Sequence, residues 1–161
     1  MRKVLDLYFR FPVFIDYVLG LSVVGVMNYN IRLGILKIPK DEIILSLASE
    51  TTTILLTLAG FILTFLTILI TFKTGNLAEN KNPSLMEKFC NSSLYKETTK
   101  LLKGGIKSLI FTTLVIYVLR FVNMSDIWVL YYWIMLSIIV LLLTILRALF
   151  ILENILNFHT E

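Results

Sequence analysis

The chain has 161 residues, of which 57% are hydrophobic and 16% charged, and its mean hydropathy is +0.83. A soluble domain is nearer about 45–50% apolar and about 25% charged, so this composition excludes an ordinary soluble domain and predicts a membrane protein. The formal net charge is +4. Cys90 has no second cysteine for a disulfide within the chain, and one cysteine with one histidine, His159, argues against a conventional zinc site.

Four apolar segments are long enough to cross a bilayer, which takes about 20 residues. We predict spans over residues 11–27, 43–72, 105–122 and 127–149. A cleaved signal peptide is the alternative for the first span, but Pro12 and Asp16 interrupt its apolar part, so we expect the span to be retained. The predicted fold is an all-α membrane protein with one four-helix transmembrane domain covering residues 1–161.

The distribution of basic residues predicts the orientation of these spans. Most lysines and arginines fall at the two termini and in the central loop, residues 73–104, which four spans place on one side. Both termini should therefore be cytoplasmic. In the loop, Ser84-Leu85-Met86-Glu87 has the form of a capping box and predicts a short helix. A second helix should begin near Ser93 and kink at Gly104-Gly105, so we expect a short cytoplasmic amphipathic helical hairpin.

The most distinctive pattern is a stripe of small and polar residues on the second predicted span. Its members recur at alternating intervals of four and three, and they are Ser46, Glu50, Thr53, Thr57, Gly60, Thr64, Thr67 and Thr71. This spacing places them on one face of a helix. In lipid, such a face packs against another helix or lines a cavity. We expect oligomerisation through the stripe. The alternative is a pore, in which Glu50 of each copy joins a carboxylate ring that favours cations.

Four charged residues fall within or at the edges of the predicted spans, namely Asp16, Glu50, Arg120 and Arg147. Intramembrane charges are costly and are usually paired or solvated. The predicted topology allows one pair of opposite sign in each leaflet, Asp16 with Arg147 and Glu50 with Arg120. Lys107 is a rival partner for Asp16. We interpret the pairs as holding the bundle together, with an ion-facing role for Glu50 as the alternative.

Four lysines follow one another along the segment that leads into the third span, at intervals of four, three and four: Lys96, Lys100, Lys103 and Lys107. This pattern is typical of a juxtamembrane helix whose lysines meet anionic lipid headgroups. The alternative is a docking surface for an acidic cytosolic protein. We expect no direct nucleic-acid binding, because Tyr95 is the one aromatic residue close to them.

The sequence contains no motif that carries catalytic chemistry. It has no glycine-rich phosphate loop, no Ser-His-Asp set, no His-Glu-x-x-His and no Cys-x-x-Cys. We therefore expect no enzymatic activity, no cofactor and no metal ion.

The second span carries the motif Gly-Phe-x-x-Thr-x-x-Thr within the segment 58–69, and a basic loop and two further spans follow it. This arrangement resembles small four-span bacterial membrane proteins of anti-phage defence systems, such as the Kiwa membrane subunit. The resemblance covers the central and C-terminal two-thirds of the chain. It implies an oligomeric inner-membrane component that senses or responds to phage attack with a cytosolic partner, and it transfers no functional residue.

We therefore predict an oligomeric sensor or scaffold subunit of the bacterial inner membrane. It would form a homo-oligomer, with a tetramer as one candidate, and would signal to a cytosolic protein partner through its basic loop. The first alternative is a pore-forming or channel protein lined by the second span, which permeabilises or depolarises the membrane. The second is an accessory subunit of a larger membrane complex.

Overall fold

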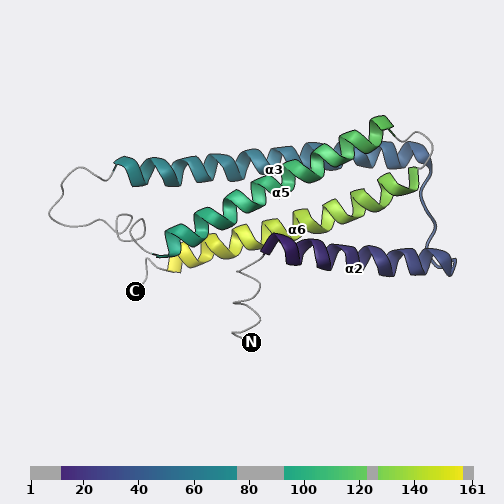
Figure 1. Ribbon diagram of the computed structural model, residues 1–161, viewed down its shortest axis with the longest axis horizontal. Coiled ribbons are helices and arrows are strands. Elements are labelled where there is room, and N and C mark those ends of the chain that lie inside the picture. The colour runs from purple at the N-terminus through teal and green to yellow at the C-terminus, as the bar shows by residue number, and fades with distance from the viewer. Residues whose placement is uncertain (1–11, 76–92, 123–126, 158–161) are drawn as a thin grey trace.

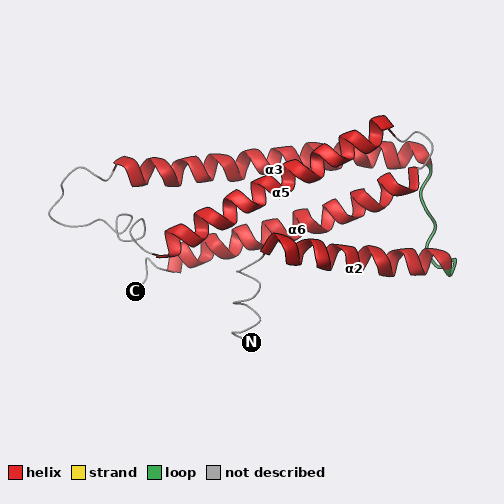
Figure 2. Cartoon of the chain, in the orientation of Figure 1, coloured by secondary structure: helices red, strands yellow, loops and turns green. Residues whose placement is uncertain are grey.

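The computed structural model describes residues 12–75, 93–122 and 127–157, in which all regular structure is helical (Figures 1 and 2). The helices are α2 (Pro12–Arg32), α3 (Asp41–Gly75), α5 (Ser93–Val122) and α6 (Ile127–Asn157). Each of them is long and apolar enough to cross a membrane. The chain is therefore a multi-pass membrane protein with an all-α four-helix fold, as its composition and apolar segments predict.

The helices are longer than the predicted spans. The first continues to Arg32, the second begins at Asp41, and the fourth continues to Asn157. The difference arises because hydropathy marks only the segment that suits hydrocarbon, whereas helical backbone hydrogen bonds continue beyond it. The predicted start of a helix at Ser93 is confirmed. The short helix expected at residues 84–90 lies outside the described residues.

α5 runs through Gly104 and Gly105 as one continuous helix that leads into the third span, as predicted, and the kink expected at the two glycines stays a prediction. Gly105 instead allows close packing against α6, because a Cβ atom there would lie 3.2 Å from Thr144 Cγ2. Such small residues let membrane helices approach closely.

The end of α2 is a capped turn. Gly34 has a φ of +74°, a left-handed conformation that glycine adopts without a Cβ penalty. The Gly34 N–H donates to the Ile31 carbonyl at 3.0 Å, and the Ile35 N–H donates to the Asn30 carbonyl at 3.1 Å. These two bonds make a Schellman motif, which satisfies carbonyls that the helix end would leave unpaired.

α5 and α6 lie at the centre of the arrangement, and each of them contacts the other three helices. α3 packs mainly against α5, and α2 packs mainly against α6. α2 and α3 are consecutive in the chain but lie at opposite edges of the bundle (Figure 1). The core between the helices is filled by buried aliphatic side chains that include Leu55, Leu109, Ile116, Ile134 and Val140.

α2 is the shortest helix, and its length decides where the molecule has a groove. Its 21 residues make a helix of about 32 Å, which matches a hydrocarbon core of about 30 Å. The other three helices have 30 to 35 residues, or roughly 45–52 Å. At the end of the bundle where α5 begins, these three helices extend well past Pro12 (Figure 1). The first turns of α5 therefore lie beyond the reach of α2.

Candidate functional site

The predicted stripe on α3 points away from the rest of the protein. Its eight members, from Ser46 to Thr71, are all exposed, and we call them the α3 stripe. The opposite face of α3 is buried against the bundle through residues such as Ile44, Leu55 and Leu69. Successive helical residues are about 100° apart, so Thr57 lies roughly 200° around the helix from Leu55. The α3 stripe is therefore turned away from the face that α3 buries in its own protomer.

The threonine hydroxyls of the α3 stripe are already hydrogen-bonded within α3. Each donates to the carbonyl four residues earlier, at distances between 2.8 and 3.0 Å: Thr53 to Ser49, Thr57 to Thr53, Thr64 to Gly60, Thr67 to Leu63 and Thr71 to Thr67. Such bonds satisfy a hydroxyl in apolar surroundings. A Cβ atom at Gly60 would meet nothing within 4 Å. Packing within the protomer therefore does not require a glycine at this position.

The predicted pair between Glu50 and Arg120 is wrong. Ser46 Oγ donates to Glu50 Oε1 at 3.0 Å, and Arg120 Nη1 donates to Ser49 Oγ at 2.8 Å. Within the part of the chain that the structure describes, no ion pair joins the two charged residues. The reason is the position of Glu50 on the outward stripe, about 100° around the helix from Ser49, which faces α5.

The predicted pair between Asp16 and Arg147 is confirmed. Arg147 Nη1 lies 2.9 Å from Asp16 Oδ2, and the exposed fractions of the two side chains are 3% and 1%. Arg147 Nη2 also donates to Thr144 Oγ1 at 3.4 Å. The pair joins α2 to α6. Lys107, the rival partner, is exposed on α5.

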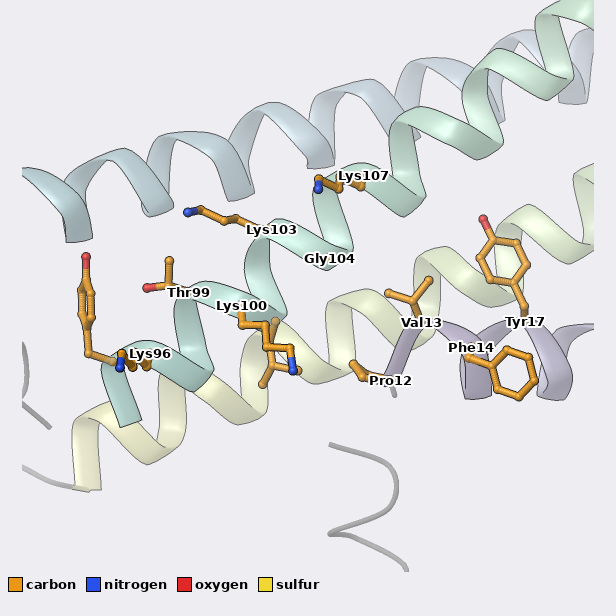
Figure 3. Close-up of a pocket in the computed structure, with 12 residues that line it drawn as sticks. Pro12, Val13, Phe14, Tyr17, Lys96, Thr99, Lys100, Lys103, Gly104 and Lys107 are labelled. Atoms are coloured by element: carbon orange, nitrogen blue, oxygen red, sulfur yellow. The ribbon is translucent and has the colours of Figure 1, made fainter. Parts of the chain in front are cut away.

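The four lysines line a groove of about 930 Å³ between the first turns of α2 and the N-terminal half of α5, which we call the lysine groove (Figure 3). Its lining residues are Pro12, Val13, Phe14, Tyr17, Tyr95, Lys96, Thr99, Lys100, Leu101, Lys103, Gly104 and Lys107. None of these is acidic, and all four lysines are exposed. The groove thus combines four positive charges with an apolar wall supplied by the start of α2.

Two contacts hold the walls of the lysine groove in place. Ser108 Oγ donates to Tyr17 Oη at 3.3 Å, which joins α5 to α2 at one end of the groove. At the other end, Lys73 Nζ of α3 lies 4.6 Å from the centre of the Tyr95 ring, a cation–π contact. The groove therefore lies between two helices, α2 and α5, and α5 is itself held against α3 beside it.

Sequence reasoning missed a set of buried hydroxyl residues between α5 and α6. Ser108, Thr112, Ser137 and Thr144 are all buried, and Trp133 Nε1 donates to the Thr112 carbonyl at 3.3 Å. A signal was present, because Gly105, Ser108 and Thr112 are spaced by three and four residues and Ser137 and Thr144 by seven. These intervals place each set on one helical face, as in the α3 stripe.

No family model, no curated protein and no solved structure matches the chain. Across residues 12–75, 93–122 and 127–157, no group of three or more His, Cys, Asp or Glu residues could hold a metal ion. Cys90 and His159 lie outside these ranges. The candidate sites are therefore the α3 stripe, the lysine groove and the buried ion pair.

Proposed function

We propose that the protein is an oligomeric scaffold or sensor subunit of a membrane, whose copies pack against one another through the α3 stripe. The observation that carries the proposal is the outward direction of this stripe, opposite the face that α3 buries in its own protomer. Contact with lipid alone does not account for a stripe of threonines and a glycine, since leucine, isoleucine and phenylalanine already suit acyl chains. Its regular spacing suits a second helix.

The hydrogen bonds of the stripe favour a dry contact between copies. Because each threonine hydroxyl donates to its own helix, the stripe presents mainly methyl groups and the bare backbone at Gly60. Helices with small residues at such intervals can approach closely and gain van der Waals contact. Identical stripes on identical protomers also provide self-complementary surfaces, which symmetric oligomers require.

The biological setting is part of the same proposal. The basic residues support an orientation with both termini in the cytoplasm. The resemblance of segment 58–69 to the Kiwa membrane subunit supports a bacterial inner membrane and a role in anti-phage defence. In this role the oligomer, with a tetramer as one candidate, would signal to a cytosolic protein through the loop that follows α3.

Disulfide crosslinking along α3 tests the assembly. In a Cys90→Ser background, single cysteines replace Thr57 and Thr64 on the stripe, and Ile54 and Leu63 serve as matched exposed controls on the two flanks. A disulfide requires Cβ atoms within about 3.5–4.5 Å, so it reports direct contact between copies. We expect oxidant to produce dimers from the stripe positions in native membranes. Equal crosslinking on stripe and flanks, or none on the stripe, would refute the proposal.

A pore remains the second candidate because Glu50 is exposed on the same stripe, hydrogen-bonded to Ser46. A ring of carboxylates at one end of a stripe-lined path would favour cations. The same cysteine variants separate the two functions. Labelling of Thr57→Cys and Thr64→Cys by a water-soluble, membrane-impermeant thiol reagent would indicate a hydrated path. A change in cation selectivity in Glu50→Gln would then be expected in planar bilayers.

A further inference from the structure

We propose that the lysine groove is a binding site for a single anionic phospholipid, whose phosphate lies among the lysines and whose acyl chains lie beside the exposed apolar start of α2. This inference rests on observations separate from the α3 stripe, so either proposal can fail without the other. It goes beyond a general attraction of lysines to a charged membrane, because it assigns one lipid to a groove between α2 and α5.

The charge of the groove is uncompensated within the described residues. None of Lys96, Lys100, Lys103 and Lys107 takes part in an ion pair there, and no lining residue is acidic. The nearest predicted carboxylate partner, Asp16, is buried and paired with Arg147. The four lysines therefore place an unpaired positive charge along about 17 Å of the described part of α5, and an anion can neutralise it.

The depth of the groove favours a lipid over a cytosolic protein. Val13 lies against Gly104, and Tyr17 accepts a hydrogen bond from Ser108, so this part of α5 is level with the first two turns of α2. α2 is only just long enough to span the hydrocarbon core, which places Lys107 roughly 6 Å inside the boundary that Pro12 marks. A cation at this depth turns toward the headgroups or finds an anion in the membrane. A soluble partner does not reach it.

The other walls of the groove fit the remainder of a phospholipid. Pro12, Val13 and Phe14 form an apolar edge, and the Phe14 side chain is 70% exposed (Figure 3). The Thr99 hydroxyl in the opposite wall has no hydrogen-bond partner among the described residues, so it can donate to a phosphate oxygen. The volume of about 930 Å³ lies in the range of roughly 300–1,000 Å³ that small-molecule sites occupy. A free phosphate ion would use the lysines but leave the apolar edge without a partner.

Native mass spectrometry of the full-length protein tests the site directly. The protein is released from nanodiscs that contain equal amounts of phosphatidylglycerol and phosphatidylcholine, and the lipids retained per protomer are counted. The test variant is Lys100→Gln with Lys107→Gln. The matched control is Lys37→Gln with Lys40→Gln, which removes the same charge at the other end of the bundle. All four side chains are exposed, so none of the changes disturbs a buried contact. Folding of both variants is checked by circular dichroism.

We expect the unmodified protein to retain phosphatidylglycerol over phosphatidylcholine, with one tightly held molecule per protomer. The groove variant should lose this retention at least about fivefold, which corresponds to about 1 kcal/mol, while the control stays within about twofold. Thr99→Val should weaken it less. Equal loss in both double variants would show bulk attraction only and overturn the proposal.

Two further outcomes would also overturn it. If millimolar inorganic phosphate displaces the retained lipid and binds equally well, the groove is a free-anion site. If the lipid is retained only after residues 2–10 are deleted, the chain itself covers the groove. Retention that is unaffected by both treatments supports the lipid site.

Discussion

Separating the charges of the buried ion pair should destabilise the bundle strongly. In Asp16→Asn the carboxylate is lost, and the Arg147 guanidinium stays in a position where its side chain is only 3% exposed. The remaining contact to Thr144 Oγ1, at 3.4 Å, is long and does not compensate a full charge. The same reasoning applies to Arg147→Met, which leaves the Asp16 carboxylate buried.

The expected size follows from this burial. Removing one partner of a buried pair costs about 3–5 kcal/mol, because the other charge is left without compensation. For a chain of this size, 1 kcal/mol corresponds to roughly 2–4 °C, so the midpoint of thermal unfolding should fall by roughly 6–20 °C. The double variant Asp16→Leu with Arg147→Met removes both charges and should recover most of the loss, since apolar replacement of a buried pair is often nearly neutral.

Thermal unfolding in detergent, followed by circular dichroism on all three variants, measures the coupling between the two positions. Arg120→Met is the control, because Arg120 is exposed and its loss should cost less than about 1 kcal/mol. If either single variant of the pair is no less stable than this control, the pair does not hold α2 to α6. If the double variant loses the sum of the two single losses, the charges are not coupled, and the reasoning is equally refuted.

Three smaller changes test two contacts between helices and the capped turn at the end of α2. A Cβ atom at Gly20 would lie 2.5 Å from Leu136 Cδ1, so Gly20→Val should cost about 1–3 kcal/mol, whereas Gly25→Val meets open space and should cost clearly less in the same unfolding assay. Trp133→Phe removes the hydrogen bond to a carbonyl of α5 and should cost about 1 kcal/mol, with little change in helix content by circular dichroism. Gly34→Ala places a side chain at a φ of +74° and should cost about 1–2 kcal/mol; an unchanged unfolding midpoint would contradict the capped turn.

The fold class and one charge pair could be predicted before any coordinates were known. Four long apolar segments leave a chain few options in lipid, because every backbone polar group must be paired within its own helix. Asp16 and Arg147 could be matched because opposite charges at equal depth have few other partners in a membrane. Helix ends were predicted less well, since hydropathy does not mark where a helix stops once it has left the hydrocarbon.

The direction in which each face points was decided only by the tertiary structure. The spacing of the α3 stripe predicted one face of a helix, but periodicity is the same whether that face turns inward or outward. Rotation of α3 is set by the fit of Ile44, Leu55 and Leu69 into the bundle, and this rotation turns Glu50 outward, away from α5.

The lysine groove depended on the tertiary structure in the same way. The sequence determined that four lysines share one face of α5, because their spacing follows the helical period. This face lies beside the apolar start of α2 only because α2 begins level with the middle of the lysine series on α5. Such an offset results from contacts between helices, such as Val13 with Gly104, and a local pattern in the sequence does not contain it.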